Sequence, residues 1–202
     1  MAEPRPRLIL ASASPRRLDL LASAGLVPDA VEPTDIDESE IPGELPGPLA
    51  RRLALEKAAA HPDGDAFVLA ADTVVGVGRR ILPKAETEAQ ARACLALLSG
   101  RNHRVYTGIA LRTPDGELTA KLVETKVKFK RLSAPELESY IASGEWRGKA
   151  GGYGIQGRAG AYVISLIGSY TGVVGLPIHE TVNLLAGRGY PVLDVQNETK
   201  TP

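Results

Sequence analysis

The chain has 202 residues, enough for one domain or for two small lobes that share a core. Lysine and arginine together number 24, as do aspartate and glutamate, and aromatic residues make up only 4%. This composition lacks the net positive charge and the aromatic stacking platforms of nucleic-acid-binding surfaces, so we expect no nucleic-acid partner. A polyanion would have to bind to a local cluster of charged side chains.

The sequence indicates neither a membrane protein nor a disulfide-stabilised one. No stretch approaches the roughly 18 apolar residues of a membrane span, and the first apolar run is too short for a secretory signal. The single cysteine, Cys94, cannot form an internal disulfide. We therefore expect a cytoplasmic protein with no membrane partner.

Helices and strands alternate in the N-terminal half. Apolar runs predict strands at residues 8–11 and 67–77. Ser14 as a cap predicts a helix at 15–23, and helices are also predicted at 49–60 and 87–98; each of the three is followed by glycine or proline. Such alternation is typical of α/β folds.

The C-terminal half begins with a predicted hairpin, strands 104–112 and 118–132 around a Pro-Asp-Gly turn. The elements predicted after it are a helix at 134–143, strands at 162–167 and 170–174, and a last helix at 177–186. Because a hairpin follows strand–helix units, we expect a mixed, twisted sheet with flanking helices rather than a purely parallel one.

The segment between the first strand and the first helix has the composition of a phosphate site. It carries the hydroxyls of Ser12 and Ser14, and then Arg16 and Arg17 in the first helical turn. A helix N-terminus has unpaired N–H groups and partial positive charge, so arginines there oppose the helix dipole unless an anion binds. The alternative is a pair of solvated surface arginines.

Two charged residues fall where the pattern predicts burial. Asp72 interrupts the apolar run 67–77, and a buried carboxylate is costly unless it is paired, hydrogen-bonded or bound to metal. It either satisfies backbone groups or belongs to a site at the end of a central strand. Lys57 falls on the apolar stripe of helix 49–60, where it either extends to solvent or faces a partner.

Three further segments carry weaker signals. Glu38 lies in an acidic loop that is either solvated or supplies a carboxylate to a metal, and Lys84 in a turn is uninformative alone. A glycine-rich loop at 144–160 contains G-x-G-x-x-G, but a helix precedes it and a strand-rich segment follows, so we reject a dinucleotide site. The glycines instead suggest backbone close to a ligand, with Gln156 able to donate to and accept from a base.

Together, these hydroxyls, cations and carboxylates are the groups that bind a metal-chelated polyphosphate. In this arrangement the sequence resembles the Maf family of nucleotide pyrophosphatases. The matching motifs run in order from residue 7 to about 190, and they include LILASASPRR at 8–17, EKA at 56–58, ADTV at 71–74, LPK at 82–84, LSG at 98–100, VYT at 105–107, GKAGGYGIQG at 148–157 and VGLP at 174–177. Several separated motifs in order are far more specific than any single one.

The resemblance implies a two-lobed fold similar to the inosine triphosphate pyrophosphatases, formed by a single domain over residues 1–202 around a central cleft. It implies hydrolysis of nucleoside triphosphates, with dTTP and UTP preferred, to the monophosphate and pyrophosphate, as house-cleaning of nucleotide pools. It also implies a divalent cation, Mg²⁺ or Mn²⁺, and a homodimer. The family's link to septum formation leaves a non-catalytic, nucleotide-binding regulator of cell division as the alternative.

Within the matching motifs, Asp72 corresponds to the family's proton acceptor, and Arg16, Thr73 and Gln156 to positions associated with the dTTP and UTP preference. The predicted site consists of Asp72, Lys57 and Lys84 as catalytic residues, Ser12, Arg16, Arg17, Thr73 and Gln156 as substrate-binding residues, and Glu38 and Asp72 as metal ligands. Two points stay open in the sequence: whether Asp37 replaces Glu38, and whether Asp72 is the base or a metal ligand.

Overall fold

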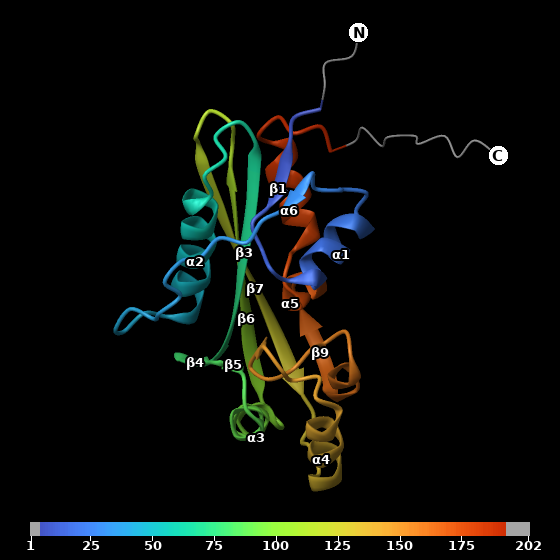
Figure 1. Ribbon diagram of the computed structural model, residues 1–202. Coiled ribbons are helices and arrows are strands. Elements are labelled where there is room, and N and C mark those ends of the chain that lie inside the picture. The colour runs from blue at the N-terminus through green and yellow to red at the C-terminus, as the bar shows by residue number, and fades with distance from the viewer. Residues whose placement is uncertain (1–4, 193–202) are drawn as a thin grey trace, which may run out of the picture.

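The computed structural model describes residues 5–192, which form an α/β fold around one long seven-stranded sheet (Figure 1). The strand order is β2-β1-β3-β6-β7-β9, with β4 paired to β3 beside that path. These strands are β1 Leu8–Leu10, β2 Ala30–Val31, β3 Phe67–Val77, β4 Arg80–Leu82, β6 Asn102–Arg112, β7 Leu118–Phe129 and β9 Val163–Ile167. Strand β1 is parallel to β2 and β3, whereas the other pairs are antiparallel, so the predicted mixed sheet is confirmed.

Helices cover both faces of the sheet (Figure 1). Helix α2 packs alanines against one face, whereas α1 and α6 pack leucines against the other. The helices are α1 Pro15–Ser23, α2 Pro46–Ala60, α3 Glu88–Leu98, α4 Ala134–Ser143, α5 Tyr170–Val174 and α6 Ile178–Ala186. A short second sheet pairs β5 Lys84–Ala85 with β8 Lys149–Ala150, and a 3₁₀ helix η1 spans Arg158–Tyr162.

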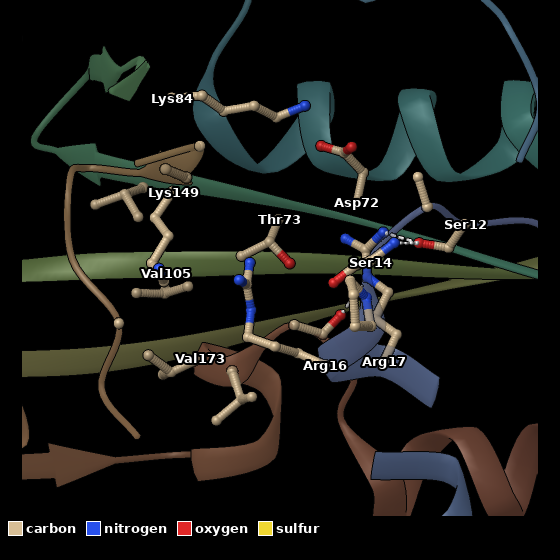
Figure 2. Close-up of a pocket in the computed structure, with 18 of the residues that line it drawn as sticks. Ser12, Ser14, Arg16, Arg17, Asp72, Thr73, Lys84, Val105, Lys149 and Val173 are labelled. Atoms are coloured by element: carbon tan, nitrogen blue, oxygen red, sulfur yellow. Dashed lines mark hydrogen bonds between the residues drawn. The ribbon is translucent and has the colours of Figure 1, made fainter. Parts of the chain in front are cut away.

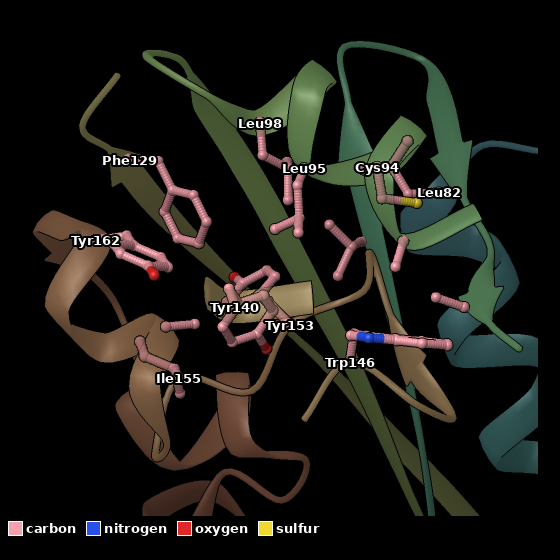
Figure 3. Close-up of a cluster of buried hydrophobic side chains, with 14 of the residues drawn as sticks. Leu82, Cys94, Leu95, Leu98, Phe129, Tyr140, Trp146, Tyr153, Ile155 and Tyr162 are labelled. Atoms are coloured by element: carbon pink, nitrogen blue, oxygen red, sulfur yellow. The ribbon is translucent and has the colours of Figure 1, made fainter. Parts of the chain in front are cut away.

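The buried side chains form separate clusters toward the two ends of the sheet. At one end, aliphatic side chains of β1, β3 and β6 pack against α1, α2 and α6. At the other end, an aromatic-rich cluster joins α3 and α4 to the far ends of β6 and β7 (Figure 3). Between residues 5 and 192, no helix has the length and apolar character needed to cross a membrane.

Helix α2 lies unusually close to the sheet because a glycine faces it. A Cβ atom added at Gly108 would lie 2.2 Å from the carbonyl oxygen of Ala50. Gly108 is the cross-strand partner of Asp72 in the β3–β6 register. The missing side chain therefore allows the backbone of α2 to approach the sheet beside the Asp72 carboxylate.

The predicted strand at residues 170–174 is wrong, because this segment forms helix α5. Its β-branched and aromatic residues resemble a strand, and so short a run has no period that distinguishes the two. The deciding contact is local: the side chain of Ser169 accepts a hydrogen bond from the N–H of Gly172 and caps the helix. The other predicted elements are present, with ends shifted by up to three residues, as where α2 begins at Pro46.

Candidate active site

A cavity of about 380 Å³ lies at the edge of β3 (Figure 2). On this edge β3 pairs with β1 over residues 67–69 and with β4 over 75–77. Among the described residues, no strand pairs with this edge of β3 between those two stretches, where Asp72 and Thr73 lie; their pairing with β6 is on the opposite edge. All nine residues predicted from the sequence line this cavity: Ser12, Arg16, Arg17, Glu38, Lys57, Asp72, Thr73, Lys84 and Gln156. The fold thus brings the predicted set together, while their chemical roles stay predictions.

Four of these residues form a chain of alternating charges. The ammonium group of Lys57 lies 2.7 Å from Asp72 Oδ1 and 2.6 Å from Glu38 Oε1. The other Glu38 oxygen, Oε2, lies 2.7 Å from the ammonium group of Lys84. Asp72 and Lys57 are only 4% and 8% exposed, so their pairing offsets the cost of burying two charges. Lys57 therefore faces a partner instead of extending to solvent.

The acidic loop directs Glu38, not Asp37, into the cavity. Desolvation raises the pKa of Glu38, but hydrogen bonds from Lys57 and Lys84 outweigh it and lower this pKa to about 2. Asp37 instead accepts a hydrogen bond from the backbone N–H of Ser39 and does not line the cavity. The geometry thus favours Glu38 for any role that needs a carboxylate here.

Ser12 presents a hydrogen-bond donor to the cavity. Its Oγ accepts from the Arg17 guanidinium at 2.8 Å and from the backbone N–H of Ser14 at 3.2 Å. Both lone pairs are then used, so the O–H of Ser12 is the group left to bind a ligand. Arg17 is fixed by a second bond, from its Nε to the carbonyl of Gly175 at 2.9 Å. A donor held beside Arg16 at a helix start suits an anion.

The cavity continues around the β3 edge to the opposite face of the sheet. Neighbouring strand residues project to opposite faces, so Asp72 points toward α2 and Thr73 away from it (Figure 2). On the Thr73 side of the sheet, the apolar floor of the cavity consists of side chains from β3, β6 and α5, namely Val75, Val105, Val173 and Val174. One compartment is therefore rich in charge, and the other is suited to a flat, partly apolar group.

The glycine-rich loop closes the apolar compartment, with Gln156 exposed at its rim. Tyr153 anchors this loop, since its hydroxyl lies 2.8 Å from His103 Nε2 on β6. Sequence reasoning missed this anchor, because the contact depends on tertiary structure.

The interpretation that the loop's glycines approach a ligand needs correction for two of them. A Cβ atom on Gly151 would meet Val75 at 3.0 Å, and one on Gly152 would meet the Ala91 backbone at 3.3 Å. These two glycines therefore allow close packing against the protein core. Gly148 and Gly154 do line the cavity.

Sequence reasoning also missed Lys149, which lines the cavity from β8 and appears in Figure 2. Desolvation, assisted by the charge of Arg16, lowers the pKa of its ammonium group. The resemblance to the Maf motif was the one signal that included this lysine.

The donor set of the cavity fits a hard divalent cation that is shared with a ligand. Over residues 5–192, no cluster of three or more His, Cys, Asp or Glu side chains could hold a metal with protein ligands alone. Asp72 and Glu38 nevertheless offer two carboxylates on either side of Lys57. Mg²⁺ binds in this way, through one or two carboxylates together with waters and phosphate oxygens.

The fold and the cavity define an α/β protein with clustered cations and carboxylates in a cavity beside its central mixed sheet. Residues 7–188 match the family model described as Maf-like protein, so the chain belongs to the Maf family. It is 78% identical over 192 residues to a dTTP/UTP pyrophosphatase of Maricaulis maris, covering 95% of this chain and 92% of the relative. It is 65% identical over 188 residues to a dTTP/UTP pyrophosphatase of Caulobacter vibrioides, covering 92% and 97%.

Among solved structures, the chain is similar to a nucleoside-triphosphatase / dITP/XTP pyrophosphatase from Mycobacterium abscessus. The two are 22% identical, with a TM-score of 0.43 over 63% of this chain and 75% of that one. A HAM1 protein from Coxiella burnetii matches with 18% identity and a TM-score of 0.41, over 63% and 74%. Likeness at this level does not bear on substrate or mechanism.

Proposed function

We propose that this protein hydrolyses nucleoside triphosphates, with dTTP and UTP preferred, to the monophosphate and pyrophosphate, and so removes them from the nucleotide pool. The observation that carries the proposal is the charge chain Asp72–Lys57–Glu38–Lys84 in one cavity with Arg16 and Arg17. The names of the two close relatives agree with this substrate class.

The cations and the serine bind the triphosphate in this proposal. Ser12 donates its O–H to a phosphate oxygen, because both of its lone pairs are already used. Arg16, Arg17 and Lys84 stabilise the charge that accumulates on the departing pyrophosphate, the role that positioned cations serve in phosphoryl transfer. The apolar floor beyond Thr73 then accommodates the nucleoside.

Asp72 is the base in this proposal. Lys57 holds Asp72 Oδ1, which leaves Oδ2 to take a proton from a water molecule. The water oxygen forms a bond to the α-phosphorus, and the bond from that phosphorus to the oxygen bridging it to the β-phosphorus breaks. Pyrophosphate leaves with the bonding electron pair, and Asp72 then releases its proton to solvent, so one triphosphate and one water yield one monophosphate and one pyrophosphate.

A divalent cation, Mg²⁺ or Mn²⁺, belongs to the proposal, with Glu38 and Asp72 as the residues that would hold it; where Asp72 Oδ2 holds the cation, Asp72 is a metal ligand instead of the base, because Lys57 occupies Oδ1. When bound, it supplies positive charge against the oxygens of the triphosphate. Lys57 separates the two carboxylates and limits their repulsion in the free protein. Lys84, on the other Glu38 oxygen, keeps that carboxylate directed into the cavity.

The test is a panel of nucleoside triphosphates with Mg²⁺ or Mn²⁺, with monophosphate, pyrophosphate and orthophosphate quantified. We expect equal amounts of monophosphate and pyrophosphate, with the highest kcat/KM for dTTP and UTP. Orthophosphate as the sole phosphate product would contradict the proposal, since it indicates attack at the γ-phosphorus. Tight binding without turnover would favour the regulatory alternative.

The setting of the enzyme is part of the same proposal. We propose that residues 1–202 form a single domain with two lobes around a central cleft. We also propose a cytoplasmic homodimer that needs no nucleic acid or membrane. Sedimentation velocity with and without a nonhydrolysable nucleotide measures the oligomeric state directly.

A further inference from the structure

Thr73, which is half-buried, and Thr107, which is buried, form a pair of hydroxyls on the nucleoside side of the cavity. They are direct partners in the β3–β6 register, and their Oγ1 atoms lie 3.1 Å apart. Thr107 is only 1% exposed, and its Oγ1 also lies 2.8 Å from the carbonyl oxygen of Gly172. The three groups thus form a chain from the cavity wall into α5.

The chemistry of the three groups fixes the direction of both hydrogen bonds. Each threonine hydroxyl has one hydrogen, and the Gly172 carbonyl can only accept. Gly172 lies near the end of α5, where carbonyls lack donors from their own helix, so an unpaired carbonyl there would be costly. Thr107 therefore donates to Gly172, and Thr73 must donate to Thr107.

This direction leaves Thr73 with lone pairs, and no hydrogen, to offer a ligand. We propose that Thr107 is a positioning residue that makes Thr73 an obligatory hydrogen-bond acceptor toward the nucleoside. The inference rests on the proposed function and extends it to a specificity mechanism. Ser12 has the opposite polarity, since its lone pairs are used and its O–H is free. The cavity thus presents a donor at the anion end and an acceptor at the nucleoside end.

An acceptor at this position discriminates among bases. Uracil and thymine carry an N3–H donor, whereas N3 of cytosine is a bare lone pair that would face the Thr73 lone pair. The 3′-hydroxyl of the sugar is a second donor that could satisfy the same acceptor. A mismatched, buried polar contact commonly costs tenfold or more in kcat/KM.

The experiment compares Thr107→Val with Thr107→Ser in the full chain. Valine removes both hydrogen bonds, so the Thr73 hydroxyl is free to rotate and to donate to N3 of cytosine. We expect the UTP-to-CTP ratio of kcat/KM to fall by about tenfold in Thr107→Val and to stay near the wild-type value in Thr107→Ser. If Thr107 had a purely structural role, Thr107→Val would lower kcat/KM for UTP and CTP alike. Thermal melting reports whether each variant folds.

A second pair of substrates, dTTP and its 3′-deoxy analogue, shows whether the base N3–H or the sugar 3′-hydroxyl donates to Thr73. If the sugar hydroxyl is the donor, Thr107→Val keeps the UTP-to-CTP ratio but lowers the ratio of dTTP to its 3′-deoxy analogue. Both ratios at wild-type values in a folded Thr107→Val variant would overturn the inference. Thr73→Val provides an independent check, because it removes the acceptor without disturbing the bond from Thr107 to Gly172.

Failure of the proposed function is distinguishable from failure of this inference. If the wild-type protein releases no pyrophosphate from UTP, the proposed function fails. Calorimetric titration with α,β-imido analogues of UTP and CTP then tests the hydroxyl pair by binding alone. A wild-type preference for the uridine analogue that Thr107→Val loses supports the pair, and equal preferences in both proteins overturn it.

Discussion

The Lys57 ammonium group donates a hydrogen bond to Asp72 Oδ1 over 2.7 Å, joining helix α2 to strand β3 inside the cleft. This contact depends on the close approach of α2, which the absence of a side chain at Gly108 permits. It orients one carboxylate oxygen and leaves the other for chemistry. The first predictions concern this pair and the glycine beside it.

Asp72→Asn should keep the fold and lower turnover by roughly 10²–10⁴, the usual contribution of a positioned base. Asparagine has nearly the same shape, and its amide oxygen can still accept from Lys57, which also retains Glu38. Pyrophosphate release per folded molecule and the circular dichroism melt measure the two effects. Wild-type turnover in the folded variant would remove Asp72 from the mechanism.

Lys57→Met should lower both activity and stability. Methionine matches the length of the aliphatic part of lysine but leaves the buried Asp72 carboxylate unpaired, and removal of one partner of a buried pair costs about 3–5 kcal/mol. Partial exposure of Glu38 places the expected loss at the lower end of that range. Denaturant unfolding measures the loss, with Arg51→Met, exposed on the same helix, as the matched control.

The same variant tests the cation site. Without Lys57, no cation lies between the Asp72 and Glu38 carboxylates, although Lys84 still pairs with Glu38, so Mn²⁺ should raise the melting temperature more in Lys57→Met than in the wild type. An equal shift in both proteins would argue against Asp72 and Glu38 as the ligands.

Gly108→Ala should be severely destabilising although it adds a single methyl group. The new Cβ would lie 2.2 Å from the Ala50 carbonyl oxygen, so α2 would have to move away from the sheet. We expect a loss of about 3 kcal/mol or more in the free energy of unfolding, at the upper end for overpacking. Gly64→Ala, which has no neighbour within 4 Å, is the control. A small effect at residue 108 would mean that α2 shifts readily.

The sequence predicted most of the fold because its longer elements have clear periodicity. Strand β3 is a nearly continuous apolar run, and α3 and α4 are bounded by the capping boxes of Thr87 and Ser133. Helix α5 escaped prediction because five residues carry no usable period. Strands β2, β4, β5 and β8 were missed for the same reason, since each has only two or three residues.

The residues of the cavity were predictable, but their contacts were not. Helical spacing placed Lys57 on the inward face, yet its pairing with Asp72 depends on how α2 sits over β3. Thr107 reads as an ordinary strand residue, and only the register of β6 against β3 places it opposite Thr73. Tertiary contacts of this kind leave no local pattern in the sequence.

The burial of His103 should make the stability of the protein depend on pH. It is 2% exposed, and desolvation lowers its pKa from 6.5 to about 4. The unfolded chain therefore takes up a proton more readily than the folded protein does. The contribution of neutral His103 to the free energy of unfolding is fully present above about pH 6.5 and is lost as the pH falls toward 4. The loss is about 3 kcal/mol, because each pKa unit corresponds to ~1.4 kcal/mol.

Denaturant unfolding at several pH values between 7 and 4 measures this dependence. His103→Gln, which keeps a hydrogen-bonding group near Tyr153, should have a shallower slope than the wild type. His179→Gln, at an exposed histidine, should keep the wild-type slope. Identical slopes in all three proteins would mean that carboxylates, not His103, dominate the acid response.

Gln156 should set base choice together with Thr73. It lies at the rim of the compartment, and its amide can both donate and accept. With Thr73 as an acceptor for N3–H, the Gln156 amide N–H is free to donate to a neighbouring carbonyl of uracil or thymine. Cytosine presents an amino group at position 4 instead. We expect UTP and dTTP to exceed CTP and purine triphosphates in kcat/KM by more than about tenfold.

Gln156→Ala should narrow this preference while pyrophosphate release persists. In the proposal, Gln156 neither takes the proton from water nor binds a phosphate. Gln156→Glu is the sharper variant, because a carboxylate accepts but does not donate and should repel the O4 carbonyl. It should reduce kcat/KM for UTP more than for CTP, whose amino group can donate to it. Unchanged selectivity in both variants would show that Gln156 does not contact the base, and that Thr73 and the apolar floor choose it alone.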